Sequence, residues 1–161
     1  MVSSPATPAV ILAAARCASL GRQAGIATQE SLEAVAQRAL CFRPPWVALL
    51  LRLRRGLLRL MGLQSPHQGA LPAPSLPLLP GSRTGIYTVL AAEPGLYWLA
   101  AAQDRHLDSW LAFHAEEASS LKPRLVLATS LAQPHGWRGR IYLLLTSPLQ
   151  ALILKSALKP R

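Results

Sequence analysis

The stretch Ile86–Ala115, IYTVLAAEPGLYWLAAAQDRHLDSWLAFHA, decides the fold of this chain. It contains apolar, β-rich runs separated by two polar breaks, Glu93-Pro94-Gly95 and Asp104–Asp108. Runs of this kind joined by short glycine-containing turns are typical of hairpin strands. No connection is long enough for a crossover helix, so we expect an antiparallel meander with strands at Ile86–Ala91, Leu96–Ala102, Leu107–Ala115 and Arg124–Gln133.

The strand that follows the second break has two unlike faces. Because side chains alternate along a strand, one face carries His106, Asp108, Trp110, Ala112 and His114. The other face carries Leu107, Ser109, Leu111 and Phe113. The window Asp104–Asp108 also has the highest density of titratable groups in the chain. The polar face of this strand is therefore where we expect a site.

Helical spacing occurs on the N-terminal side of these strands. The segment Thr28–Cys41 has Thr28 as its expected N-cap and Glu30 in its first turn, where the helix dipole favours an acid. Pro44-Pro45 ends this helix and begins a second predicted helix, Trp46–Met61. The following residues, Gln64–Ser82, contain five prolines and predict a loop.

The C-terminal part returns to helical spacing over Trp137–Lys159, with Pro148 expected to kink or break the helix. Residues 1–27 show no clear periodicity, so we expect a poorly ordered lead followed by a single domain at residues 28–161. The predicted fold class is α+β. It is an antiparallel meander sheet of about four or more strands, covered by a long C-terminal helix and accompanied by two N-terminal helices.

The chain is strongly basic and rich in apolar residues. Its net charge is +10, 51% of its residues are hydrophobic, and its seven acids all lie between Glu30 and Glu117. The basic charge indicates nucleic acid or anionic lipid as a partner, or simply an arginine-rich composition. The arginines lack the aromatic interleaving of a base-stacking surface, so we do not expect nucleic acid. No apolar run approaches the roughly 20 residues of a spanning helix, which argues against a transmembrane protein.

The two cysteines, Cys17 and Cys41, are too few for a disulfide framework and are not spaced as a metal-binding pair. They are compatible with a cytoplasmic location, with peripheral membrane association as a further option. The sequence gives no indication of a cofactor or a metal, and it does not determine the oligomeric state.

One arginine of the predicted helix Trp46–Met61 stands out. Arg54 falls inside the apolar arc of the helix, whereas three other arginines share a separate stripe, Arg52, Arg55 and Arg59. A buried guanidinium cannot lose its proton, so it needs a carboxylate, several carbonyls or a bound anion. Asp104 or Asp108 could supply the carboxylate in a purely structural pair, or the side chain could extend to a nearby edge.

Several blocks carry a family resemblance. They are Phe42-Arg43-Pro44-Pro45-Trp46-Val47, Leu53-Arg54 running to Gly62-Leu63, Gly85-Ile86-Tyr87, Asp104–Asp108 and Gly139-Arg140-Ile141-Tyr142. In this order they resemble the bacterial family called domain of unknown function 2867, over about Leu40–Leu158. The resemblance implies a helix-grip-like arrangement, in which a curved antiparallel sheet wraps a long C-terminal helix and the space between them can hold an apolar ligand.

The chain departs from the family pattern at several positions. Where relatives tend to have an aromatic residue and an arginine after His-Leu-Asp, this chain has Ser109 and Trp110. Ser130 and Gln133 stand where Thr and His are usual, and the last helix has Pro148-Leu149-Gln150 in place of Pro-x-His. These changes remove imidazoles and an arginine on which a shared catalysis would depend.

We expect a small apolar-ligand-binding or carrier-type domain without catalysis, in which polar anchors lie in an apolar cavity. The expected ligand-binding residues are Arg54, His106, Asp108, Trp110, Ser130 and Tyr142.

The alternative is a peripheral membrane or protein-interaction module that uses the basic helix 46–61, with Trp46 and Trp137 as interfacial anchors. A hydrolase built from His106, Asp108 and Ser130 is weakly indicated, because the chain has no Gly-x-Ser-x-Gly motif. A metal site is also weakly indicated, because His106, Asp108 and His114 span too much strand to meet at one ion.

Overall fold

The structure is a computed structural model that describes residues 8–42, 45–46, 48–49, 52, 56, 75–104, 107–116 and 124–158. Its helices and strands follow one another in a fixed order along this part of the chain. They are α1 (Ala9–Cys17), β1 (Leu20–Thr28), α2 (Leu32–Cys41), β2 (Arg83–Thr84), β3 (Tyr87–Glu93), β4 (Tyr97–Gln103), β5 (Leu107–Glu116), β6 (Arg124–Pro134) and α4 (Gly136–Leu158).

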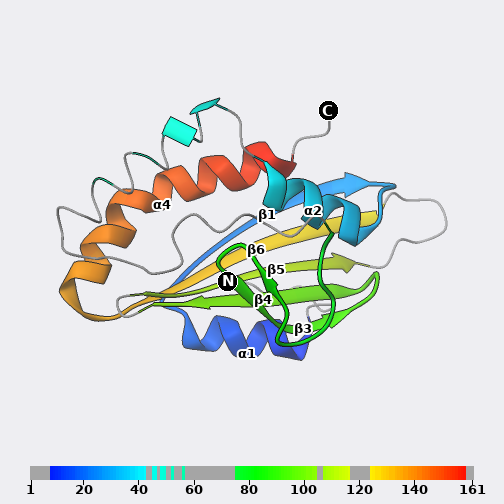
Figure 1. Ribbon diagram of the computed structural model, residues 1–161, viewed down its shortest axis with the longest axis horizontal. Coiled ribbons are helices and arrows are strands. Elements are labelled where there is room, and N and C mark those ends of the chain that lie inside the picture. Colours follow the sequence, from blue (N-terminus) through cyan, green and yellow to red (C-terminus); the bar gives the residue numbers. More distant parts are fainter. Residues whose placement is uncertain are drawn as a thin grey trace.

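The strands form one antiparallel sheet of six strands in the order β1-β6-β5-β4-β3-β2 (Figure 1). The four strands expected from the sequence are β3 to β6, and each pairs with its neighbour along the chain. The short β2 extends the sheet beyond β3, and β1 extends it beyond β6, with Leu20 opposite Ala132 and Thr28 opposite Arg124. The meander is therefore the centre of a wider sheet.

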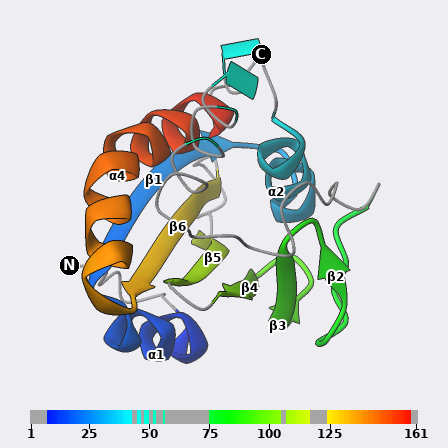
Figure 2. The same ribbon diagram turned by 60° about the vertical axis from the view of Figure 1, so that its left-hand side comes forward.

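The predicted fold class is wrong in its architecture. The sheet has six strands. The N-terminal segment, expected as a poorly ordered lead over residues 1–27, contains α1 and nearly all of the edge strand β1, so residues 9–27 are ordered. The helix α4 packs mainly on β1, β6 and α2, along one edge of the sheet, and does not cover it (Figure 2). The helix-grip-like description therefore does not hold. Periodicity missed β1 because Gly21 and Gly25 are typical of loops, and an exposed edge strand needs few apolar residues.

Two other helical predictions differ from the structure. Residues 45, 46, 48, 49, 52 and 56 are helical, as expected for the segment Trp46–Met61, but Arg54 lies outside the described residues. The helix α4 runs without interruption through Pro148, where a break was one of the two expected outcomes.

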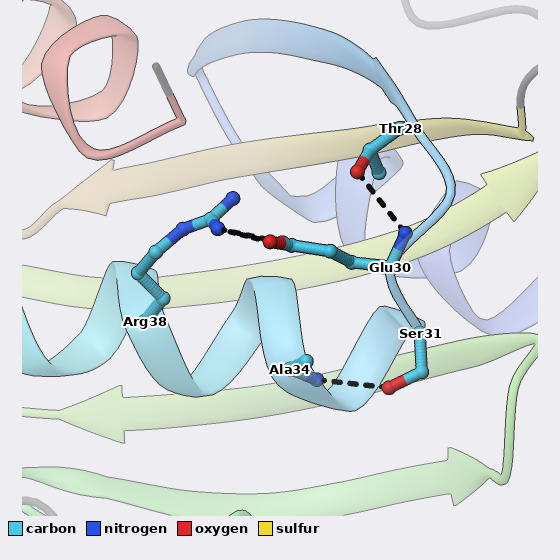
Figure 3. A network of polar contacts seen from close by, with 5 residues as sticks. All are labelled: Thr28, Glu30, Ser31, Ala34 and Arg38. Atoms are coloured by element: carbon cyan, nitrogen blue, oxygen red, sulfur yellow. Dashed lines mark hydrogen bonds and ion pairs between the residues drawn. The ribbon is translucent and has the colours of Figure 1, made fainter. Parts of the chain in front are cut away.

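The helix α2 begins at Leu32, and its N-cap is Ser31 and not Thr28. The backbone N–H of Ala34 donates a 3.2 Å hydrogen bond to Ser31 Oγ, which satisfies a group that the first helical turn leaves unpaired. Thr28, the last residue of β1, accepts a hydrogen bond from the N–H of Glu30 at 3.1 Å. Glu30 also forms a surface ion pair with Arg38, in which Arg38 Nη1 lies 2.6 Å from Glu30 Oε2 (Figure 3). These contacts fix the route of the chain from β1 into α2.

A tight turn joins β3 to β4 and anchors the start of α2. Leu96 N–H donates to the carbonyl of Glu93 at 3.0 Å, and Gly95 has φ +73°, which glycine adopts without strain. Gly95 N–H donates a 2.6 Å hydrogen bond to Glu33 Oε1, and Arg124 donates to the Gly95 carbonyl. Burial acts to raise the pKa of Glu33, but hydrogen bonds from backbone N–H groups, Ser31 and the charge of Arg124 leave that pKa lowered.

Apolar side chains cover both faces of the sheet. On one face, called here the α2 face, Trp98 and Phe113 are fully buried with ring centroids 6.0 Å apart, and they pack with Leu32 and Val35 of α2. On the opposite face, called here the α1 face, Ile11 and Ala14 of α1 pack on Leu99, Ala112 and Leu131. Both views show α1 on one side of the sheet and α2 and α4 on the other (Figures 1 and 2).

Candidate functional site

The strand β5 presents the two faces that the sequence predicts. Leu111 and Phe113 pack in the core of the α2 face, whereas Trp110 and Ala112 pack in the core of the α1 face. Because side chains alternate along a strand, Asp108 and His114 share the α1 face with Trp110. The described candidates on the polar face of β5 therefore lie on the side of the sheet that α1 covers.

Two polar side chains are completely buried on the α1 face. His114 and Thr129 each have an exposed fraction of 0%. Thr129 lies opposite Ala112, and His114 lies opposite Leu127 on the same pair of strands. The two residues are therefore diagonal neighbours, and diagonal positions on adjacent antiparallel strands are about 7–8 Å apart.

The polar atoms of this pair are unsatisfied. Nδ1 and Nε2 of His114 and Oγ1 of Thr129 make no hydrogen bond with any described residue. A buried donor or acceptor left without a partner destabilises a fold by about 1–3 kcal/mol. Most buried polar groups in proteins are hydrogen-bonded, so orphan atoms of this kind call for a partner other than the described side chains, such as a bound molecule or an ordered water.

The core around the pair is mostly apolar, with Gln23 of β1 opposite Thr129 and Tyr97 of β4 opposite His114 as the polar neighbours on the same face. The core beneath α1 is made by Ile11, Ala14, Leu99, Ala112 and Leu131, with Tyr97 and Trp110 partly buried against it. The nine residues of α1 span about 13.5 Å at 1.5 Å per residue. The strand from Trp110 to His114 covers a similar length, about 13 Å at 3.3 Å per residue. The helix α1 is therefore long enough to cover this part of β5.

Burial lowers the pKa of His114 below its ordinary value of 6.5, and the nearby carboxylate of Glu116 opposes that shift without cancelling it. The imidazole is therefore neutral at neutral pH. A neutral imidazole offers one N–H donor and one nitrogen acceptor, and the hydroxyl of Thr129 can act in both ways. The pair can hold a neutral polar group but has no charge to offer.

The window Asp104–Asp108 lies at the turn between β4 and β5. Asp104 and Leu107 exchange backbone hydrogen bonds of 3.0 and 3.3 Å, and Arg105 and His106 lie outside the described residues. Asp108 contacts an imidazole that was not among its expected partners. His135 Nε2 lies 3.1 Å from Asp108 Oδ2, and both side chains are partly exposed.

His135 could have been found from the strand register but not from composition. Asp108 pairs with Gln133 of β6, so a residue just past the end of β6 comes near the start of β5. Pairing of β5 with β6 is expected from the meander, but the offset between the two strands is not visible in the sequence.

Ser130 and Tyr142, the remaining expected ligand-binding residues that the structure describes, do not lie with the buried pair. Ser130 lies opposite Leu111 and Arg22, on the α2 face and away from His114. Tyr142 is buried on α4. Arg54 and His106 lie outside the described residues, so their role stays a prediction. The structure brings Asp108 and Trp110 to one face and leaves Ser130 on the other.

Among the residues that the structure describes, no three His, Cys, Asp or Glu side chains are grouped to hold a metal ion. Cys17 and Cys41 are both exposed and are not joined in a disulfide. Within the same residues, no helix has the length and apolar character needed to cross a bilayer.

Comparison with known proteins adds a family and no activity. The family model described as "Protein of unknown function (DUF2867)" matches residues 21–157, which extends the resemblance into β1. None of the curated proteins matches the chain. The chain is similar to protein MLL2253 from Mesorhizobium loti, with 15% identity, a TM-score of 0.42, and coverage of 86% of this chain and 96% of that one. It is also similar to an uncharacterised protein from Rhizobium leguminosarum, with 12% identity, a TM-score of 0.40, and coverage of 86% and 93%.

Proposed function

Because the chain belongs to the DUF2867 family, whose description assigns no activity, we propose its function from the buried polar pair. We propose that it binds a small, largely apolar molecule between α1 and the sheet, through one neutral polar group. The observation that carries this proposal is that His114 and Thr129 are fully buried without a hydrogen-bond partner among the described residues.

The chemistry of the pair selects the polar group of the ligand. A hydroxyl, ketone or amide can pair with a neutral imidazole and a hydroxyl at once, because both side chains donate and accept. A carboxylate or an ammonium group would be buried without an opposite charge, which is strongly unfavourable. The preferred ligand is therefore neutral, and its body matches the apolar residues beneath α1.

Access to the pair requires α1 to move. Of the residues of α1, only Ile11 and Ala14 are buried, and fully burying a side chain of the size of isoleucine contributes about 1.5–3 kcal/mol. The helix is held at its C-terminal side, where Ser19 N–H donates to the carbonyl of Ala132 at 3.1 Å. Lifting α1 about this anchor exposes His114 and Thr129 at a modest energetic cost, which hydrogen bonds to a ligand offset.

The proposal keeps part of the set expected from the sequence. Trp110 borders the pair on the same face, and Asp108 lies one step further along β5, towards the turn. Catalysis is not part of the proposal, because the expected nucleophile, Ser130, lies on the α2 face.

The test compares His114→Phe and Thr129→Val with matched controls, His135→Phe and Ser130→Ala. The protein as purified is examined by native mass spectrometry for a bound molecule. Thermal unfolding is then followed with a panel of medium-chain alcohols, ketones, amides and fatty acids. We expect neutral alcohols, ketones or amides to raise the melting temperature of the wild type and both controls, and to have little effect on His114→Phe and Thr129→Val.

Two results would contradict the proposal. One is a shift with fatty acids that survives in His114→Phe, because that ligand would not use the pair. The other is the absence of any bound molecule and of any shift across the panel, which would leave an ordered water as the partner of the two side chains.

A further inference from the structure

Apolar side chains of α4 lie exposed on the surface. Trp137 is 66% exposed, Ile141 42%, Leu144 77% and Leu152 51%. At 100° per residue these four side chains fall within an arc of about 80°. The opposite side of the helix is buried, with Gly139, Tyr142, Leu143 and Ala157 at its centre. The exposed residues are called here the α4 stripe.

Packing among the described residues leaves the side chains of the α4 stripe largely exposed. An exposed apolar patch on a helix marks a surface that contacts another molecule or a membrane. It is also separate from the site beneath α1, because α1 and α4 lie on opposite sides of the sheet (Figure 2). The ligand-binding proposal therefore does not account for it.

The positive charge of the chain indicates which kind of partner this surface binds. The helix carries Arg138, Arg140 and Lys155, and no acidic residue follows Glu117 in the sequence. Arg140 is exposed. The whole chain has a net charge of +10, so a second copy would be repelled from this surface. An anionic surface would be attracted, and an anionic bilayer can also accept the apolar side chains.

We propose that the α4 stripe docks on an anionic lipid bilayer, with α4 lying parallel to the membrane. Leu144 and Ile141 enter the region just below the headgroups, and Trp137 sits at headgroup depth, where indole rings are favoured. Arg140 contacts the lipid phosphates. The described part of the chain has no helix able to cross a bilayer, so the contact is an attachment to the surface.

The experiment is sedimentation of the full chain with phosphatidylcholine vesicles, with and without phosphatidylglycerol. Leu144→Ser tests the stripe, and Leu79→Ser is its matched control, because Leu79 is 75% exposed in the segment before β2. We expect binding that requires phosphatidylglycerol and decreases as salt is raised. Leu144→Ser should weaken it about tenfold, since one buried leucine contributes at least that factor, and Leu79→Ser should leave it unchanged.

A second measurement separates docking from self-association. Sedimentation equilibrium without lipid should give a monomer at all concentrations for both the wild type and Leu144→Ser. The proposal is overturned if phosphatidylglycerol vesicles bind nothing at low salt, if both leucine variants lose binding equally, or if the wild type forms a dimer that Leu144→Ser abolishes. The last outcome would assign the stripe to a second copy of the chain.

Discussion

The imidazole Nε2 of His135 lies 3.1 Å from Oδ2 of Asp108, so the residue that follows β6 contacts the second residue of β5. The contact joins two junctions of the fold, the turn between β4 and β5 and the start of α4. Both side chains are partly exposed, at 47% for His135 and 23% for Asp108, and water therefore screens their interaction.

The contact between Asp108 and His135 should contribute little to stability. Exposed ion pairs are typically worth between zero and about 1 kcal/mol. We expect a double-mutant cycle with Asp108→Asn and His135→Ala, measured by urea unfolding at pH 6, to give a coupling energy below about 1 kcal/mol. A coupling of several kcal/mol would mean that the pair is buried in solution.

The stability of the protein should fall in mild acid because of His114. The pKa of His114 is lowered in the folded state by burial, so the unfolded chain takes up the proton first as pH decreases. The free energy of unfolding therefore keeps its full value above pH 6.5. As the pH falls below 6.5 it decreases, until the pH reaches the lower pKa of His114 in the folded state. His114 binds at most one proton, so it changes the free energy of unfolding by at most about 1.4 kcal/mol per pH unit.

This pH dependence can be assigned by comparing variants. The titratable groups around His114 are Glu116, two residues further along β5, and Tyr97, which lies opposite on β4. Urea unfolding between pH 4.5 and 8 should show a shallower slope for His114→Phe than for the wild type. The control Ser130→Ala, which removes no titratable group, should keep the wild-type slope, and an equal change in both variants would assign the effect elsewhere.

Removing the orphan hydroxyl of Thr129 should stabilise the unliganded protein. Valine has nearly the same shape as threonine and leaves no unsatisfied polar atom, so Thr129→Val should raise the free energy of unfolding by about 1 kcal/mol. Ser109→Ala provides the contrast, because Ser109 Oγ donates a 3.2 Å hydrogen bond to the carbonyl of Ala102. The free energy of unfolding of Ser109→Ala should decrease by about 1 kcal/mol. A decrease in Thr129→Val as well would show that Thr129 has a bound partner.

The turn between β3 and β4 should not tolerate a side chain at Gly95. Its φ of +73° is strained for any residue with a Cβ, so Gly95→Ala should destabilise the fold by about 1–2 kcal/mol. A Cβ there would meet only the Arg124 guanidinium at 3.8 Å or more, so the loss is conformational and not steric. Gly56→Ala is the control, since Gly56 is helical with open space around it, and alanine there should be neutral or stabilising by up to about 1 kcal/mol.

Local patterns predicted the central strands well. The runs that became β3 to β6 are bounded by turn residues, and alternation assigned Trp110, Ala112 and His114 to one face of β5 and Phe113 to the other. The same rules failed at α1 and β1. The strand β1 has a weak pattern of its own, and it forms because nine of its residues pair with β6, far away in the sequence. Local patterns also gave Thr28 the role of N-cap, which Ser31 takes because Thr28 still belongs to β1.

The sequence by itself determined the antiparallel meander, the two faces of β5 and the C-terminal helix, because these follow from periodicity and turn residues within short windows. Only the tertiary structure decided that β1 closes the sheet beside β6, that His135 meets Asp108, and that Thr129 lies buried beside His114 beneath α1. These relationships depend on strand register and on which helix covers which face. Contacts between distant segments set both, and no single segment encodes them.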